Sequence, residues 1–544
     1  MSDFSGIMRA IRAMFTDVEY EREQLHAYQR DLAIPFLMEN PFSMLLIGMG
    51  MGKTISALTV VADLLEDFAY DKVLIIGPMR VATQTWPNEI RAWRHTAHMR
   101  HSLIHISDDH PSVKAAGKAA RVEARLAGMS QGDANKAAGK AQTAEKERLR
   151  VIACHDNATI HIIPIDWIDW LVEHFKWNWP YRMVIIDESS TVKDHTSNRF
   201  KALRNLVTHK PKNGGKLIER FHLMTATPAA ETYEHLFAQT FLLDGGTRFG
   251  KHITHFRNEF FVQNHYTKKY TLRPNAEEQL LAKIADIALV MKAEDYLDVE
   301  NPEIIKRPVR LGAAEMELYK TLEREFIVTL PNGREVEAET AAALSQKLLQ
   351  MASGVLYETY LDEDLETDDM KKVKVVHRIH DQKLDELDEI IAEAQGEPVL
   401  VSYWWKSTLE RLRKRHPKAV VMDREGSCVK AWNAGKIPLL FMHPMSGGHG
   451  LNLQKGGHIM VIFDMFHSLE LFIQLVGRLA RQGQKHLVRV YMLTAIGTLD
   501  EVVVTAQRAK EEAQEKMFVI LKKLIAAFRK QKEAIQQREL EEEL

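Results

Sequence analysis

Apolar and polar residues alternate through the first half of the chain in a pattern that predicts strands separated by helices. Between residues 20 and 245, short apolar runs typical of buried strands are separated by segments with apolar residues at helical spacing. This order predicts a parallel sheet with helices on both faces. The predicted strands are SMLLIG, KVLIIGP, ATIHIIP, RMVIID and FHLMTAT.

The same alternation returns after about residue 376 and predicts a second α/β domain. KLDELDEIIAEA predicts a helix, and PVLVSYW, KAVVMD, PLLFMHP, HIMVIFD and VRVYML predict strands. The domains that we expect are an N-terminal domain at 1–245, a connecting region at 246–375, a C-terminal domain at 376–505 and a charged helix at 506–544.

Residues 112–150 interrupt the first alternation with an Ala-rich, charged segment that has almost no large apolar residues. Basic residues outnumber acidic ones there, and the segment predicts a helical hairpin that stands off the core. A solvated insertion and a DNA-contacting insertion are both open interpretations of this composition.

The connecting region mixes aromatic and basic residues, with an aromatic cluster at 255–270 that we expect to pack against the first domain rather than to act as a strand-separating wedge. Asn332-Gly333 predicts a two-residue hairpin turn, and the acidic stretch 361–369 predicts a loop or linker.

In the last helix, the apolar stripe predicts docking on the parent domain. The stripe consists of Met517, Leu521, Leu524 and Phe528.

Composition narrows the function classes only slightly. The net charge is −2, so any nucleic-acid surface must be local, and two distant cysteines offer neither a disulfide framework nor a zinc cluster. The N-terminus lacks the apolar segment of a signal peptide, and no apolar run is long enough to span a bilayer. We expect no membrane association.

The stretch LLIGMGMGKTISAL places three glycines before Lys53 and Thr54. The strict phosphate-loop pattern fails by one place, because Ile47 stands where the first glycine belongs. The context still fits, since an apolar strand precedes the loop and a helix begins at the Lys-Thr pair. Backbone N–H groups and a helix N-terminus can cradle phosphates there. A simple glycine-rich turn is the competing interpretation.

A second candidate site is a pair of acids, Asp187 and Glu188, at the end of the predicted strand RMVIID. Asp187 can hold Mg²⁺ and Glu188 can orient and deprotonate an attacking water. Two acids at a strand end are common by chance, but a phosphate loop on the same sheet strengthens the catalytic interpretation.

These motifs belong to an ordered set that resembles the Swi/Snf-type ATPases of helicase superfamily two over about residues 20–505. The set includes LHAYQR at 25–30, TATP within 223–260, KLDELDEII at 383–391, PMSGGHGLNLQKGGHIMVIFD at 444–464 and QLVGRLARQGQ within 474–503. The resemblance implies two RecA-like domains and an ATP-dependent motor that moves on double-stranded DNA. A strand-separating DNA or RNA helicase and a nucleotide-gated DNA-binding switch are the alternatives.

The resemblance also implies residue roles, with ATP and Mg²⁺ as cofactors. Arg478 and Arg481, three apart and so expected on one helix face, would reach the γ-phosphate and act catalytically with Lys53 and Glu188; a solvated helix face is the alternative. Thr54 and Asp187 would hold the metal. ATP would be bound by Gln29, Gly48, Met49, Gly50, Met51, Gly52, Lys53 and Thr54, and coupling or DNA contact would involve Thr225, Ala226, Thr227, Gly447, Gly448, Gly450 and Asn452.

The sequence departs from the family pattern in three motifs, at five residues. Ile47-Gly48 replace the usual Asp-Glu before the loop, Ser190 stands at the usual histidine place, and His467-Ser468 replace a Trp-Asn pair. No recognisable chromatin-reading module or fused nuclease is present, so we expect a minimal bacterial or phage-like motor. Its expected location is the cytoplasm of a bacterium or phage-infected host, or the nucleus of a eukaryote, with a nuclease or replication factor as a candidate partner protein.

Overall fold

The computed structural model describes residues 18–212, 214–266, 268–297, 300–363, 370–423, 426–445 and 451–543. The chain divides into two compact units. The first unit runs to Met291 and takes in the chain again from Met517, and the second unit is Lys292–Lys516. None of the helices in the described part of the chain is long and apolar enough to cross a membrane.

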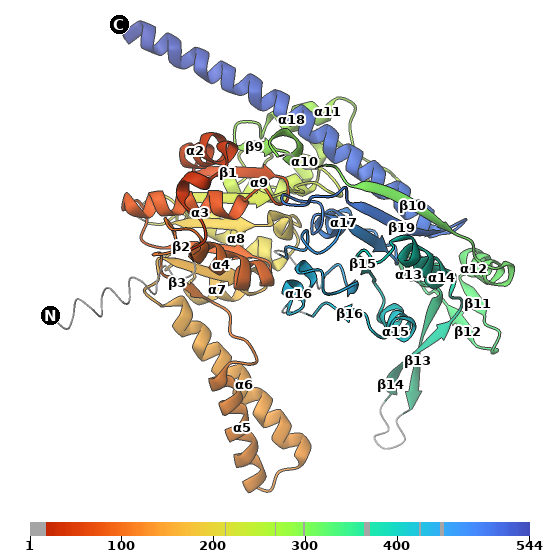
Figure 1. The fold of residues 1–544 in the computed structure, drawn as a ribbon. Helices are drawn as coiled ribbons and strands as arrows, with labels where there is room; N and C mark the ends of the chain where they lie inside the picture. Colours follow the sequence, from red (N-terminus) through yellow and green to blue (C-terminus); the bar gives the residue numbers. More distant parts are fainter. Residues whose placement is uncertain are drawn as a thin grey trace. The chain divides into compact units, whose positions relative to one another are not determined.

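The first unit is built on a parallel sheet of seven described strands in the order β3-β4-β2-β5-β6-β1-β9 (Figure 1). All five strands predicted for this region are present, so the predicted parallel sheet is confirmed. The strands are β1 (Phe42–Ile47), β2 (Val73–Gly77), β3 (His101–Leu103), β4 (Ile160–Pro164), β5 (Met183–Asp187), β6 (Arg220–Thr225) and β9 (Ala288–Met291).

Helices flank this sheet because their apolar faces join its core. A buried cluster of the unit combines strand residues such as Leu46 and Ile186 with helix residues such as Leu203 and Phe237. The helices are α2 (Ile34–Glu39), α3 (Lys53–Glu66), α4 (Trp86–Ala92), α7 (Ile168–Phe175), α8 (Asn198–Thr208), α9 (His235–Asp244), α10 (Ile253–Phe260) and α11 (Ala276–Ala282).

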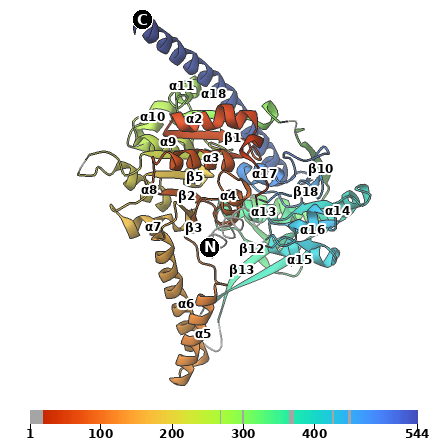
Figure 2. The ribbon, with the colours of Figure 1, turned by 60° about the vertical axis from the view of Figure 1, so that its left-hand side comes forward.

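The basic insertion forms the predicted helical hairpin, with α5 (Pro111–Leu126) antiparallel to α6 (Gln131–Cys154) and extending away from the sheet (Figures 1 and 2). Small residues let the two helices approach closely, since an added Cβ at Gly117 would lie 2.6 Å from the Gln142 amide nitrogen. Gly128 turns the chain between them with φ +75°. Ser130 caps α6 by accepting a hydrogen bond from the Asp133 backbone N–H.

The aromatic cluster at 255–270 packs mainly into the first unit, as expected. Phe256, Phe260 and Phe261 are buried members of the sheet's core. The antiparallel ribbon β7 (Phe261–Gln263) and β8 (Tyr270–Leu272) follows, and Tyr266 in its turn is exposed.

Helix α18 (Leu499–Glu543) returns to the first unit and docks on its core through Met517, Phe518, Leu521 and Ile525. Leu524 packs against the same core, whereas the predicted stripe residue Phe528 is 42% exposed.

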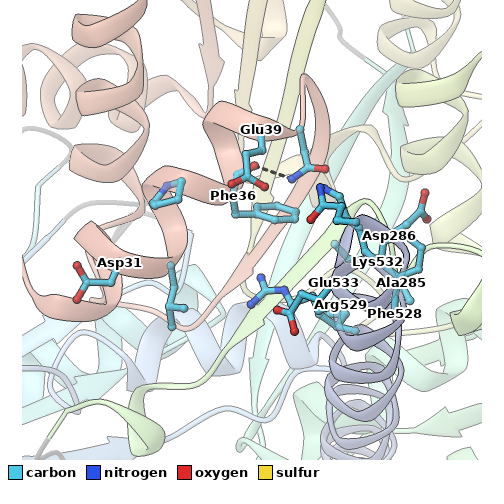
Figure 3. Close-up of a pocket in the computed structure, with 15 residues that line it drawn as sticks. Asp31, Phe36, Glu39, Ala285, Asp286, Phe528, Arg529, Lys532 and Glu533 are labelled. Carbon is cyan, nitrogen blue, oxygen red and sulfur yellow. Dashed lines mark hydrogen bonds between the residues drawn. The ribbon is translucent and has the colours of Figure 1, made fainter. Parts of the chain in front are cut away.

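Farther along α18, a cavity of about 630 Å³ opens beside α2 and the approach to β9 (Figure 3). Its wall combines Asp31, Glu39 and Asp286 with Arg529 and Lys532. The residues that line it do not include any from the glycine loop or from strands β5 and β6.

The second unit contains a sheet of six described parallel strands in the order β10-β19-β18-β15-β17-β16, which confirms the second α/β fold. The strands are β10 (Glu303–Val309), β15 (Val399–Ser402), β16 (Val420–Val421), β17 (Leu439–Met442), β18 (Ile459–Ile462) and β19 (Arg489–Ala495), and the helices are α12 (Ala313–Glu325), α13 (Ala341–Ala352), α14 (Gln382–Glu393), α15 (Lys406–Arg415), α16 (Val429–Asn433) and α17 (Leu469–Val476).

Two antiparallel ribbons complete the second unit. β11 (Ile327–Thr329) pairs with β12 (Glu335–Glu337), which confirms the hairpin but not its predicted two-residue turn. The Leu330 N–H donates to the Arg334 carbonyl, and the Gly333 N–H donates to the Leu330 carbonyl. Gly333 has a positive φ of 80°, whereas the ring of Pro331 fixes a negative φ. The chain therefore adopts a longer loop that ends in a left-handed glycine.

The second ribbon pairs β13 (Val355–Glu363) with β14 (Met370–Arg378). The acidic stretch predicted as a loop or linker therefore begins within β13, which is a correction for residues 361–363. Residues 364–369 lie outside the described residues.

Candidate functional site

Three neighbouring strands of the first sheet bring the predicted ATP motifs to one edge. β6 pairs in parallel with both β1 and β5, with Leu46 opposite Thr225 and Asp187 opposite Met224. Because parallel strands end at the same edge, the glycine loop after β1, Thr225-Ala226-Thr227 after β6 and Asp187-Glu188 after β5 converge there.

The loop after β1 has the geometry of an anion cradle. Gly50 and Gly52 have φ values of 76° and 67°, which glycine adopts without the steric cost of a Cβ. Gly52 is the N-cap of the 14-residue helix α3, so the helix N-terminus faces the loop. The Lys53 ammonium folds back over it and donates to the carbonyls of Ile47 at 3.0 Å and Gly48 at 3.4 Å.

Gln29 lies directly against this loop and is 3% exposed. Its amide nitrogen donates to the carbonyls of Met51 and Gly52, each at 3.3 Å, and its amide oxygen accepts from the His26 N–H at 2.9 Å. The neighbouring Tyr28 hydroxyl donates to the Met51 carbonyl at 3.2 Å. Burial raises the pKa of Tyr28 to about 12, so this hydroxyl remains a donor at neutral pH.

The two acids after β5 are buried and differ in their contacts. Asp187 accepts hydrogen bonds from the Trp86 indole at 3.0 Å and from the Glu188 N–H at 3.1 Å. Burial, and then repulsion by Glu188, raises the pKa of Asp187 to about 6, while the positive charge of Lys53 opposes the shift. Glu188 has left-handed backbone geometry with φ 56°, a strained conformation for a residue with a side chain.

The segment after β6 contacts the acid pair directly. The Thr225 hydroxyl donates to the Glu188 carboxylate at 3.5 Å and accepts from the Thr227 N–H at 3.0 Å. A second connection runs from the Ser189 hydroxyl to the Gln239 amide oxygen at 2.7 Å, and the Gln239 amide nitrogen donates to the Pro228 carbonyl at 2.7 Å. The acid strand and the threonine segment are therefore tied at two points.

The other residues predicted at this edge of the sheet differ in their exposure to solvent. Met51, Ala226 and Thr227 are buried, whereas Gly48, Met49 and Thr54 are partly exposed beside the loop. Ser190, at the usual histidine place, is 3% exposed within the turn Ser189–Val192.

The arginines of the second unit lie beyond the helix on which they were predicted. Helix α17 ends at Val476, and Arg478 and Arg481 occupy the turns that follow, so the prediction of a shared helix face is wrong. Gly477 caps the helix and the chain turns there. Ser468, one of the departures, begins the helix as its N-cap.

Both arginines contact the segment that follows the glycine motif. Arg478 is 5% exposed and its guanidinium donates to the Leu451 carbonyl at 3.5 Å, and Arg481 donates to the Asn452 side-chain oxygen. The Asn433 amide also holds this segment, through the Asn452 carbonyl at 2.7 Å. The predicted glycines of this motif, Gly447, Gly448 and Gly450, lie outside the described residues.

Two residues that contact the acid segment, Trp86 and Gln239, are not predicted by the sequence motifs. A tryptophan on a helix after the second strand is only weak evidence for a role in the site, because most such residues only pack in the core. Its hydrogen bond to Asp187 depends on the pairing of β2 with β5, which local sequence does not specify.

A glycine loop, a lysine and paired acids at one edge of a parallel sheet define a nucleotide hydrolase of the phosphate-loop class. The family model of the SNF2-related domain matches residues 37–358. The chain therefore belongs to the SNF2-related family and is an ATP hydrolase.

Similar proteins include p41 of Acyrthosiphon pisum secondary endosymbiont phage 1, at 30% identity over 90% of this chain and 97% of that protein. The "Probable ATP-dependent DNA helicase CHR12" of Arabidopsis thaliana is 24% identical over 91% of this chain, which spans 41% of that protein. Among solved structures, the Sulfolobus solfataricus SWI2/SNF2 ATPase core in complex with dsDNA is 17% identical over 92% of this chain and 97% of that chain, with a TM-score of 0.40.

Proposed function

We propose that this SNF2-family ATPase translocates along double-stranded DNA without separating the strands. The observation that supports a working motor is the direct contact between the Thr225 segment and the Glu188 carboxylate at 3.5 Å. This contact joins the proposed hydrolytic base to a segment that can sense its state. Double-stranded DNA is proposed from the resemblance to Swi/Snf motors.

The residues at the sheet edge fit a magnesium–ATP complex. Asp187 is a buried carboxylate whose pKa is raised by burial and then by repulsion from Glu188, and Thr54 is the second residue of helix α3, which follows the glycine loop. A bound Mg²⁺ would neutralise charge on the phosphates. We assign its ligation to Thr54 and Asp187 and the adenine contact to Gln29.

Different side chains of the protein have separate roles in the hydrolysis step. The Lys53 ammonium exchanges its two loop carbonyls for phosphate oxygens, and the loop N–H groups hold the same phosphates. Glu188 orients a water molecule and accepts its proton as the γ-phosphate is attacked. Arg478 and Arg481 supply positive charge to that phosphate, a contribution worth roughly 10³–10⁵ in rate for this chemistry.

Coupling and DNA contact complete the proposal. Thr225, Ala226 and Thr227 relay the state of Glu188, and Asn452 with Gly447, Gly448 and Gly450 forms part of the coupling or DNA-contacting surface. We place the motor in the cytoplasm of a bacterial or phage-infected cell, where a nuclease or replication factor is a candidate partner.

The decisive experiment compares triplex displacement with fork unwinding in the same buffer, with Lys53→Ala as the inactive control. We expect ATP-dependent displacement of a third strand and a forked duplex that stays paired. Fork unwinding without triplex displacement would favour a helicase. ATP binding with negligible turnover on double-stranded DNA, single-stranded DNA and RNA would favour a nucleotide-gated switch.

A further inference from the structure

Three side chains with metal-binding atoms meet where the helical hairpin joins the first unit. Cys154 is the last residue of α6, His155 is its C-cap, and His174 lies in the last turn of α7. The Nε2 atoms of the two histidines are 3.0 Å apart, and these atoms and the cysteine Sγ all lie within 4.8 Å of one another. The cysteine is buried and both histidines are exposed.

We propose that Cys154, His155 and His174 bind a Zn²⁺ ion that fastens the base of the hairpin to α7. Thiolate sulfur and imidazole nitrogen are the donors that zinc prefers. In a tetrahedral site, bonds of about 2.0–2.1 Å to nitrogen and 2.3 Å to sulfur place the donors about 3.3–3.6 Å apart. The separations in the structure, 3.0 Å between the two nitrogens and at most 4.8 Å among the three atoms, lie close to these values, and the exposed side leaves the fourth position to water.

The backbone around this cluster favours a cation. The 24-residue helix α6 and the 8-residue helix α7 both end at this cluster, so the negative ends of two helix dipoles lie beside the three ligands. A bound metal ion would accept a lone pair from each of the two imidazole nitrogens, which lie 3.0 Å apart. The convergence of two helix C-termini is independent of the ligand types and supports the same ion.

The histidine rings are held in place by aromatic neighbours. Trp170 stacks on His174 with ring centroids 5.3 Å apart, and Phe175 packs edge-on against His155 at 5.2 Å. The Trp170 indole also donates to Glu147 on α6. Such surroundings limit the rotation of the ligands and reduce the entropy lost when a metal binds.

The proposed ion would have a mechanical consequence for the insertion. One ligand pair comes from the end of α6 and the third from α7, which packs in the sheet's core through Ile168 and Leu171. A metal bond between the two helices fixes the direction in which the hairpin leaves the core. The insertion would then act as a positioned arm of the motor rather than as a loosely attached decoration.

The test uses tag-free full-length protein that has been stripped with a chelator and titrated with Co²⁺ and then Zn²⁺. We expect one Co²⁺ per chain with a thiolate-to-metal charge-transfer band, and displacement of this band by Zn²⁺. His155→Ala combined with His174→Ala should weaken binding by more than the roughly 10–100-fold that loss of an outer contact costs. These side chains are exposed, so the double variant should fold.

Matched controls separate this site from adventitious binding. Cys428→Ser removes the other cysteine, and His98→Ala removes an exposed histidine from another part of the first unit. Both should keep the stoichiometry and the band, and Zn²⁺ should slow proteolysis of the hairpin only in proteins that retain the cluster. A missing charge-transfer band, or equal binding by the double-histidine variant, would overturn the proposal.

Discussion

The Gly52→Ala substitution tests how the glycine loop and Gln29 form the nucleotide site. Gly52 has φ +67°, and a Cβ built on it would lie 2.2 Å from the Gln29 amide nitrogen and 3.2 Å from Ile55 Cγ2. The methyl group therefore imposes two costs. The backbone must keep a left-handed conformation with a side chain, and Gln29 must move away from the loop.

The size of the effect follows from these two costs. Left-handed geometry costs a non-glycine residue about 1–2 kcal/mol. Displacing the Gln29 amide breaks its bonds to the Met51 and Gly52 carbonyls, which are long at 3.3 Å and together worth about 1 kcal/mol. The free variant can relax both costs by leaving the native loop conformation, which ATP binding must then restore. The sum of about 2–3 kcal/mol therefore corresponds to roughly 30- to 140-fold weaker ATP binding. The fold should persist, because domain stability is typically about 5–15 kcal/mol.

Equilibrium titration with a fluorescent ATP analogue measures this loss, and Gly128→Ala provides the control. Gly128 has φ +75° but no atom within 4 Å of an added Cβ, so its substitution imposes the backbone cost alone in the hairpin turn. We expect Gly128→Ala to lower the melting temperature without changing ATP affinity. Wild-type affinity in Gly52→Ala, or equal losses in both variants, would refute the reasoning.

Further variants separate binding from hydrolysis and from DNA contact. Lys53→Ala should abolish most turnover with an unchanged circular dichroism spectrum, whereas Glu188→Gln should still bind ATP and stall before hydrolysis. Arg478→Ala and Arg481→Ala should reduce turnover far more than binding of a non-hydrolysable analogue; a parallel loss of both would indicate structural contacts instead. Replacing 112–150 with a Gly/Ser linker should preserve basal ATPase activity and reduce the salt slope of DNA binding by roughly 0.9 per lost phosphate contact.

Five of the seven described strands of the first sheet could be predicted because each is a short apolar run bounded by turns. Helices α5 and α6 could be predicted from their composition, because alanine favours helix and the many charges exclude a position in the core. The glycine loop could be recognised despite Ile47, because the strand before it and the helix after it supply the context.

Elements defined by long-range pairing could not be predicted in this way. β9 joins β1 at the edge of the first sheet, and β10 pairs with β19, although both β9 and β10 come from the region expected to connect the domains. Their short runs resemble other loop segments until a partner strand is known. The turn positions of Arg478 and Arg481 were missed for a related reason, since the spacing of two residues does not reveal where Gly477 ends a helix.

Strands β6 and β1 hold a buried pair of polar residues, His222 and Ser43, outside the candidate site. His222 and Ser43 are register partners on β6 and β1, both fully buried, and the Ser43 hydroxyl lies 2.8 Å from His222 Nδ1. The run FHLMTAT predicted the strand but not this pairing. Burial, and then the charge of Arg220, lowers the pKa of His222 to about 3.

This lowered pKa predicts acid sensitivity of the first unit. An unfolded histidine titrates near pH 6.5, so between about pH 6.5 and 3 the unfolded chain binds a proton that the folded chain does not. Stability therefore falls as pH decreases through this range, by about 2 kcal/mol at pH 5 for this group alone. Urea unfolding at pH 7, 6 and 5 should show a shallower pH slope for His222→Gln than for wild type, while the exposed-site control His98→Gln should keep the wild-type slope. An equal slope in His222→Gln would mean that this histidine accepts its proton without unfolding, and that the buried pair tolerates the charge.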